Sequence, residues 1–365
     1  MSFLLDDYDF VLPPERIAQC PAEPRDCSRL LVIDRKKGTW EHRSFRDLPE
    51  YMDSRDHLVA NNTEVLKARL QGHRIPAEGV PAQGLGGAVG GKVEFLMLEE
   101  VEPKVWEGAF HAAAKHKPGV RFRIPTPDGL GLVGVLVRGA SQSESGTVVA
   151  RFDRDPIESG AGELPLPHYI DRATESSDTT RYQTVYAKEK GSAAAPTAGL
   201  HFTEAVLREL RSRGAEWEEI TLHVGLGTFR PVKTPDVRSH VMHEERYSVG
   251  AEVASRLNEA KKHGDRIVAV GTTAVRTLES AWREGAGIVA GPGRTKVFIY
   301  PEARGQGVPL FQVVDRLITN FHLPKSTLLM LVCAFAGREL VLEAYREAVR
   351  KEYRFFSFGD AMLII

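Results

Sequence analysis

The feature that most constrains the fold is a change along the chain in the pattern of apolar and polar residues. From 65 to about 155, short alternating segments such as KVEFLMLE, VRFRI and LVGVLV are separated by Gly, Pro and Asp turns, and no apolar period of 3.6 residues is present. Beyond 165, apolar runs such as DRIVAVG and KVFIYP, which are typical of strands, alternate with amphipathic patterns typical of helices. Those helical patterns cover 203–214, 251–264, 274–285 and 339–352.

Two domains are therefore expected in the 365 residues, which are more than one hydrophobic core usually organises. Regularly spaced short strands predict a small barrel, whereas strand–helix alternation predicts an α/β unit. Strand-like runs at 29–34 and 56–62 precede the helix-free block. We predict an α/β core, a mixed sheet with flanking helices formed by 1–64 and 156–365, that is interrupted by an inserted small β-barrel domain at 65–155.

Composition excludes several classes of protein. The formal net charge of −1 excludes a strongly basic chain, so a nucleic-acid partner would have to be held by a local patch. Cys20, Cys27 and Cys333 form no CxxC spacing, which argues against a disulfide framework or a structural zinc site and favours a reducing cytoplasm. The segment MSFLLDDYDF lacks a basic start, and TLLMLVCAFAG is too short to span a bilayer. We expect a cytoplasmic protein with no membrane partner.

Three short motifs are rejected on their context. Gly86, Gly91 and Lys92 match a phosphate-binding loop, but Val93 replaces the required Ser or Thr and a strand follows instead of a helix. The segment GLGTF is followed by Pro231 and lacks the third glycine of a dinucleotide fingerprint. The segment HVMHE has no H-E-x-x-H frame, so no metal is expected.

Polar side chains gather where the expected strands end. In an open α/β sheet, ligands bind outside the carboxyl ends of the strands. The segment VGTTAVRTLE has Thr272 or Thr273 as the expected helix cap and Arg276 close behind, an arrangement suited to a carboxylate or phosphate. The other polar residues expected at these strand ends are His223, Glu279, Asn320, His322 and Asp360. Thr197 and His201 lie in the segment AAAPTAGLHF before the helix that begins at 203, and Glu244 lies in the polar segment HVMHE.

Each of these residues also has a structural interpretation. A single loop histidine is more often a hydrogen-bonded structural residue than a catalyst, and Arg276 and Glu279, three apart on a helix, can pair with each other. Asp360 can bond its own turn. The shared composition of the loops, with His, Thr, Asn, Arg and Phe beside Gly and Pro, favours a common site.

Longer segments resemble a known family. The segments APTAGLHF, TLHVGLGTF, MHEERY, VGTTAVRTLES, TNFHLPKSTLLMLVCAFAG and YRFFSFGDAML are similar to signature segments of the S-adenosylmethionine:tRNA ribosyltransferase-isomerases of queuosine biosynthesis. So are YDFVLPPERIAQCP, NNTEVLKARL, LPLPHYIDR and RYQTVYA, and the resemblance runs from about residue 8 to the end. The chain departs from the family pattern in the longer glycine-rich turn at 79–92, at Glu64 and Lys67, at His168, and after Pro301.

The resemblance implies a β-barrel inserted in an α/β core and a specific reaction. The ribosyl part of S-adenosylmethionine, a co-substrate, is transferred to 7-aminomethyl-7-deazaguanine in a tRNA anticodon, giving epoxyqueuosine-tRNA, adenine and methionine. A base must remove a C5′ proton beside the sulfonium. We expect His201 or His223 in that role, with His322 and Glu244 converging on the site.

The resemblance also implies binding sites for both substrates. Arg276 and the start of its helix, at Thr272 and Thr273, are expected to bind the methionine carboxylate, and aromatic faces to contact the sulfonium. The other residues expected to bind S-adenosylmethionine are Thr197, Glu279, Asn320 and Asp360. The aromatic candidates are Phe202, Phe229 and Phe321, and the residues expected to contact tRNA are Lys67, Arg69, Arg74, Lys115, Lys117, Arg121, Arg123, Tyr169 and Tyr182. For the basic residues, a solvated strand face is an equally good interpretation.

Two other functions remain open at this stage. One is an S-adenosylmethionine-dependent RNA methyltransferase, although no glycine-rich strand–loop–helix with a downstream acidic residue occurs early in the chain. The other is a tRNA-binding protein without catalysis, which would not need histidines in its strand-end loops. We expect a monomer with no obligate protein partner.

Overall fold

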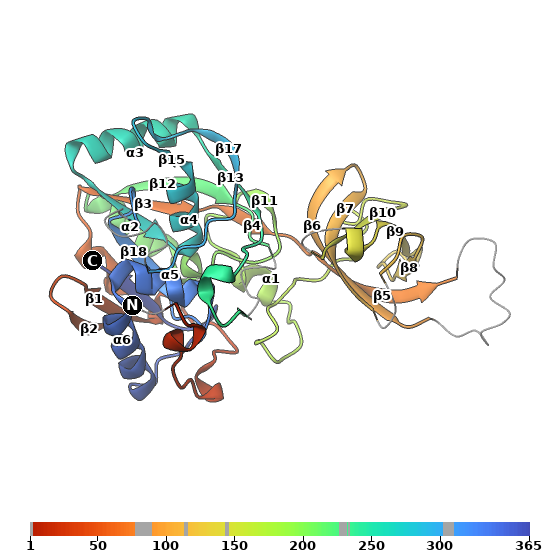
Figure 1. Cartoon of the computed structure of the whole chain (residues 1–365), viewed down its shortest axis with the longest axis horizontal. Coiled ribbons are helices and arrows are strands. Elements are labelled where there is room, and N and C mark those ends of the chain that lie inside the picture. Colours follow the sequence, from red (N-terminus) through yellow and green to blue (C-terminus); the bar gives the residue numbers. More distant parts are fainter. Residues whose placement is uncertain are drawn as a thin grey trace. The chain divides into compact units, whose positions relative to one another are not determined.

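The computed structural model describes residues 3–76, 90–112, 116–142, 146–225, 232, 234–301 and 310–365. The chain forms two compact units, which we call the sheet unit and the barrel unit. The sheet unit consists of Met1–Glu64, Pro167–Glu189 and Ala195–Ile365, and the barrel unit of Val65–Leu166 and Lys190–Ala194. Figure 1 shows the elements of both.

The sheet unit is built on one large mixed sheet. In the described residues its nine strands lie in the order β17-β13-β12-β3-β14-β18-β19-β1-β2. The neighbours β12, β3, β14 and β18 are parallel, so their carboxyl ends meet at one edge. The strands are β1 (Arg29–Asp34), β2 (Thr39–Ser44), β3 (Asp56–Asn61), β12 (Glu216–Leu222), β13 (Glu245–Val249), β14 (Arg266–Val270), β17 (Gly291–Thr295), β18 (Arg316–Asn320) and β19 (Ala361–Ile364).

Helices cover this sheet because both of its faces are apolar. On one face Leu58, Val268 and Ile318 join a buried cluster with Val206 and Leu207 of helix α2. Their neighbours along the strands, such as Val59, Ala269 and Leu317, are fully buried as well, as expected for parallel strands covered on both sides. The helices are α1 (Asp178–Arg181), α2 (Glu204–Ser212), α3 (Ala251–His263), α4 (Thr272–Ala281), α5 (Thr327–Ala336) and α6 (Arg338–Arg350).

Local signals determine where the helices begin and end. The Thr203 hydroxyl accepts a hydrogen bond from the backbone N–H of Val206 at 3.3 Å and caps α2. The Ser326 hydroxyl caps α5 in the same way, at 3.1 Å from the Leu329 nitrogen. Helix α3 ends at Gly264, whose φ of 76° is the left-handed conformation that glycine adopts without a Cβ penalty.

Among the described residues of the barrel unit, six antiparallel strands form a closed barrel in the order β10-β7-β6-β5-β8-β9 (Figure 1). Buried phenylalanines fill it, and a Cβ on Gly134 would lie 2.3 Å from the ring of Phe122, so glycine makes room for them. The strands are β5 (Arg69–Ile75), β6 (Lys92–Glu102), β7 (Val105–Ala112), β8 (Arg121–Ile124), β9 (Leu132–Arg138) and β10 (Val148–Phe152). The predicted fold class, an α/β core interrupted by a small barrel, is confirmed.

The remaining short elements connect these layers. The further strands are β4 (Thr63–Val65), β11 (Glu189–Ser192), β15 (Trp282–Arg283) and β16 (Gly287–Ile288). The 3-10 helices include η3 (Arg25–Cys27), η4 (Phe45–Tyr51) and η7 (Thr197–His201). No helix of the described ranges combines the length and the apolar character needed to cross a bilayer.

The strand predicted within KVFIYP is wrong. The segment that pairs is β17, which lies just before it and runs antiparallel to β13. The ladder ends at Thr295 because its partner, Glu245, is the first residue of β13. Beyond it, the rings of Phe298 and Tyr300 pack against each other at 4.8 Å instead of continuing the sheet.

Candidate functional site

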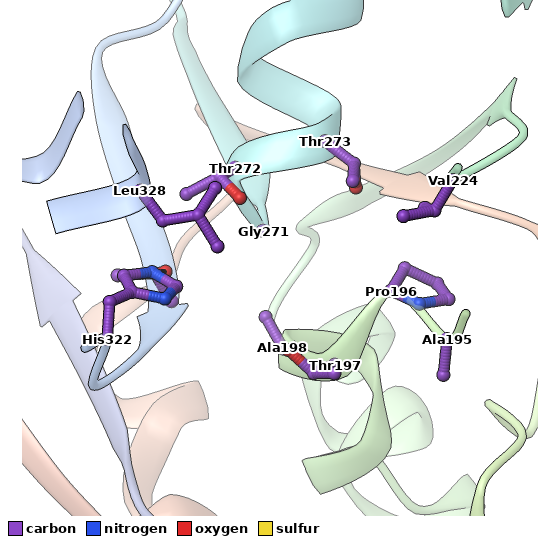
Figure 2. A pocket seen from close by; sticks show the side chains of 11 residues that line it. Ala195, Pro196, Thr197, Ala198, Val224, Gly271, Thr272, Thr273, His322 and Leu328 are labelled. Carbon is purple, nitrogen blue, oxygen red and sulfur yellow. Dashed lines mark hydrogen bonds between the residues drawn. The ribbon is translucent and has the colours of Figure 1, made fainter. Parts of the chain in front are cut away.

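A small pocket lies at the edge of the sheet unit where β12, β14 and β18 end. Segments far apart in sequence meet there: η7 and the residues before it, the first turn of α4, and the residues that follow β18. Figure 2 shows His322 and Leu328 on one side, with Val224 and Pro196 opposite. The lining residues are Ala195, Pro196, Thr197, Ala198, Val224, Gly271, Thr272, Thr273, Thr319, His322 and Leu328.

The start of α4 forms one wall of this pocket. Gly271 turns the chain between β14 and α4 with φ of 89°, and its N–H donates to the carbonyl of Ile318 at 2.8 Å. The prediction that Thr272 or Thr273 caps the helix is wrong, because the cap position is Gly271 and both threonines already lie inside the helix. Among the described residues, the buried Thr273 hydroxyl has no hydrogen-bond partner.

An ion pair is buried behind this turn. The Arg276 guanidinium donates to a carboxylate oxygen of Glu245, and both side chains are only 3% exposed. The other Glu245 oxygen accepts from the N–H of Gly225 at 3.0 Å, directly after Val224 of the pocket wall. The Nη2 of Arg276 is buried and has no hydrogen-bond partner in the part of the chain that the structure describes.

Glu279 does not pair with Arg276, which was the structural alternative for these two residues. Its carboxylate accepts from the backbone N–H groups of Gln312, Val313 and Val314 at 2.8 to 3.1 Å. Glu279 therefore holds the chain that leads into β18, one turn further from the pocket.

His322 is the histidine that lines the pocket. The residue is 7% exposed and its Nε2 lies 2.9 Å from the Thr319 hydroxyl. Its backbone N–H donates to the Tyr345 hydroxyl at 3.1 Å, which holds the loop in place. Burial lowers the pKa of His322 to about 3, so the imidazole is neutral near pH 7.

His201 lies outside the pocket lining. It ends η7, is 4% exposed, and stacks on Phe45 with ring centres 5.0 Å apart. Its Nδ1 lies 2.7 Å from the Ser28 hydroxyl and its Nε2 lies 3.2 Å from the Asn320 amide nitrogen. Burial, together with the charge of Arg354, lowers its pKa to about 3.

His223 and Glu244 have partners of their own. The His223 ring lies 2.9 Å from the Thr63 hydroxyl, and burial lowers its pKa, helped by the charge of Arg246. Glu244 forms salt bridges with Arg294 at 3.0 Å and with Lys296 at 3.7 Å. Within the described residues, neither forms a hydrogen bond or ion pair with His201. Of the predicted group, the structure joins His201 to Asn320 and brings His322 to the pocket.

The aromatic candidates are part of the core. Phe202 is fully buried against Phe45, and Phe321 is fully buried against Tyr345 and Phe355. Neither ring offers an exposed face to a ligand, so we do not propose either as a contact for the sulfonium. Phe229 lies outside the described residues.

Asp360 anchors the backbone at the start of β19. Its two carboxylate oxygens accept from the N–H groups of Arg29 and Arg354, each at 2.8 Å. Burial raises its pKa. These contacts support the structural interpretation of its turn, in which the carboxylate fastens β1 to the segment before β19.

In the barrel unit, basic side chains line up across three strands. The register places Lys92 of β6 beside His73 of β5, and His73 beside Arg123 of β8. Lys92 and Arg123 are exposed and His73 is half-buried, so they form an outward-facing basic row. Lys92 and His73 were not predicted, because the row becomes visible only when the register is known.

The other predicted basic residues differ in exposure. Lys67 and Lys117 are exposed, whereas Arg121 is partly buried. Arg69 is also partly buried, since it lies 3.6 Å from the carboxylate of Glu94 and donates to the carbonyl of Leu166. Lys115 lies outside the described residues.

The two predicted tyrosines lie in the sheet unit. Tyr169 stacks on Phe356 with ring centres 4.3 Å apart, and its hydroxyl is hydrogen-bonded to Ser357. Burial raises the pKa of Tyr169. Tyr182 is fully buried against Phe358, so its ring has no face free for a nucleobase.

Comparison with known proteins identifies the family. A family profile described as Queuosine biosynthesis protein matches residues 5–364. S-adenosylmethionine:tRNA ribosyltransferase-isomerases from Symbiobacterium thermophilum, Thermus thermophilus and Moorella thermoacetica are 50%, 49% and 48% identical, each over 99% of both chains.

A solved structure gives the same result. The crystal structure of S-adenosylmethionine tRNA ribosyltransferase from Thermotoga maritima matches with a TM-score of 0.54 and 38% identity, covering 98% of this chain and 100% of that chain. The match therefore extends over nearly the whole chain, including most of both units. The chain belongs to the S-adenosylmethionine:tRNA ribosyltransferase-isomerase family of queuosine biosynthesis.

Proposed function

We propose that the pocket at the ends of β12, β14 and β18 binds S-adenosylmethionine for ribosyl transfer. The chain moves the ribosyl moiety to 7-aminomethyl-7-deazaguanine in the tRNA anticodon, and the products are epoxyqueuosine-tRNA, adenine and methionine. The reaction takes place in the cytoplasm. The observation that carries the site assignment is that the first turn of α4 and a neutral histidine line one pocket at the carboxyl edge of parallel strands.

The first turn of α4 binds the methionine carboxylate. The N-terminal N–H groups of a helix and its dipole attract an anion. The Thr273 hydroxyl, which lines the pocket, and the Arg276 Nη2 behind it are both buried without a hydrogen-bond partner among the described residues. Residues three apart lie on the same side of a helix. A carboxylate would accept from both. The Arg276–Glu245 pair holds the guanidinium in place while it keeps one donor free.

His322 takes the proton from C5′. It lines the pocket, whereas His201 lies outside the lining and the His223 ring bonds to Thr63. If Thr319 accepts from Nε2–H, the Nδ1 lone pair is the proton acceptor. Burial makes an imidazolium costly, so the transfer relies on the acidity that the sulfonium gives to the C5′ proton. The methionine carboxylate helps, because a nearby negative charge stabilises the imidazolium.

The basic row of the barrel unit binds tRNA phosphates. Lys92, His73 and Arg123 occupy adjacent positions on three strands, and the exposed Lys67 and Lys117 add charge to the same unit. Phosphate contacts position a nucleic acid without reading its sequence. The net charge of −1 makes such a local row necessary for binding a polyanion.

Product analysis tests the proposed function. The chain is incubated with S-adenosylmethionine and a tRNA that carries 7-aminomethyl-7-deazaguanine, and the released molecules are separated. We expect adenine and methionine in equal amounts, with epoxyqueuosine in the tRNA. S-adenosylhomocysteine as the product would show a methyltransferase instead, and tRNA binding without any product would show a binding protein.

A further inference from the structure

His201 occupies a position that suits a positioning residue better than a base. Its ring is held on both sides, by the Ser28 hydroxyl at Nδ1 and by the Asn320 amide at Nε2, and it stacks on Phe45. At 4% exposure and outside the pocket lining, it does not reach a substrate in the pocket. His201 is therefore not placed to transfer the proton, and its contacts indicate a different role.

The hydrogen bonds determine which nitrogen of His201 carries the hydrogen. The Asn320 Nδ2 also lies 2.9 Å from the carbonyl oxygen of Phe356, and a carbonyl oxygen only accepts. The amide nitrogen of Asn320 must therefore face both groups, and it donates to Nε2 of His201. Nε2 is then the acceptor, and the hydrogen on Nδ1 is donated to Ser28.

Charge around the ring favours this neutral form. A second hydrogen, on Nε2, would face the N–H of Asn320 and break the contact. The cations Arg354 and Arg25 oppose an imidazolium at this site as well, in addition to burial. The ring thus acts as a fixed acceptor on one side and a fixed donor on the other.

This bond joins two segments that line the pocket. His201 is the last residue of η7, whose first two residues, Thr197 and Ala198, line the pocket. Asn320 lies between Thr319 and His322, which also line it. The His201–Asn320 contact therefore connects the segment of Thr197 with the segment of His322.

We propose that His201 is a positioning residue, a neutral imidazole that acts through Asn320 to set the end of β18 and the loop that carries His322 against η7, so that His322 faces the bound sugar. This inference rests on the proposed function of the pocket. A gap of one ångström between reacting groups costs about 100-fold in rate, so the loss of this contact should lower kcat strongly without removing any group that touches substrate.

Two variants separate positioning from proton transfer. In H201Q the amide oxygen reaches the place of Nε2 and can accept from Asn320, whereas in H201N the shorter amide reaches only the place of Nδ1. We expect single-turnover adenine release to fall about 100-fold in H201N and to recover at least about tenfold of that loss in H201Q. Both variants should keep the pH–rate profile of the wild-type chain. Equal losses in both, or the disappearance of an ionisation from the profile, would overturn the proposal.

A measurement on the wild-type chain keeps the proposal testable if a variant fails to fold. In protein labelled with ¹⁵N-histidine, the ring nitrogens of His201, assigned by comparison with H201Q or with Ser28→Ala, should show a protonated Nδ1 and an unprotonated Nε2 at pH 7. The opposite tautomer or an imidazolium would refute the proposal. If the wild-type chain released no adenine, the proposed function would fail. The tautomer of His201 would still show whether its Nε2 accepts a hydrogen bond from Asn320.

Discussion

Replacing His322 should change how the stability of the chain depends on pH. The folded chain holds this imidazole neutral with a pKa of about 3, whereas an unfolded histidine titrates near 6.5. Between those values the unfolded chain binds a proton that the folded chain refuses, so stability is lost as the pH falls below about 6.5. For one such group, linkage gives a loss of about 2 kcal/mol between pH 7 and pH 5.

The variant His322→Asn removes this titration. We expect its free energy of unfolding, measured by urea denaturation with circular dichroism and tryptophan fluorescence, to lie below that of the wild-type chain at pH 7. This difference in free energy should be about 2 kcal/mol smaller at pH 5, because only the wild-type chain loses stability when its unfolded form binds a proton at His322. His111→Gln, at an exposed position, controls for the loss of an imidazole in general. A gap that stays constant from pH 7 to pH 5 would refute the buried, neutral state of His322.

Three further predictions concern the other parts of the molecule. Arg276→Met should lower the free energy of unfolding by about 3–5 kcal/mol, because it leaves the buried Glu245 carboxylate without the Arg276 cation. The double variant Arg276→Met with Glu245→Gln should recover part of that loss in urea titrations. Equal losses of stability in the single and double variants would argue against a charged pair. Gly199→Ala should destabilise the chain by about 1–3 kcal/mol, since its Cβ would lie 2.0 Å from the Tyr186 hydroxyl, and Tyr186→Phe should relieve part of the clash; a Gly199→Ala chain as stable as wild type would contradict the packing around η7. The double variant Lys92→Ala with Arg123→Ala should reduce the slope of log affinity for tRNA against log salt concentration by about 2, because each lost phosphate contact contributes about 0.9. An unchanged slope would show that the basic row does not contact the tRNA.

Local patterns were enough to predict the two kinds of architecture. Strands β1, β3 and β14 follow apolar runs, and α2, α3 and α6 follow amphipathic patterns close to the predicted bounds. Strand β5 was missed because its segment, RLQGHRI, is mostly polar, and only Leu70 and Gly72 are buried. Neighbouring strands, rather than its own composition, hold it in the barrel.

The sequence predicted which segments form the site, but not which side chains contact each other there. The sequence pointed to the strand ends that carry Thr272, Thr273 and His322, since polar residues follow apolar runs there, and to the segment before α2 that carries Thr197. The partner of Arg276 could not be predicted, because Glu245 is 31 residues away and reaches it only through the order of the strands. Ser28 was missed for the same reason, since it lies 173 residues from His201.

The most direct test of the central claim is adenine release by His322→Asn in a single turnover with saturating S-adenosylmethionine and tRNA. If His322 moves the C5′ proton in this pocket, the variant should bind S-adenosylmethionine with nearly wild-type affinity while adenine release falls by about 100-fold or more. Adenine release within a few-fold of the wild-type rate would contradict the account and place the proton acceptor elsewhere.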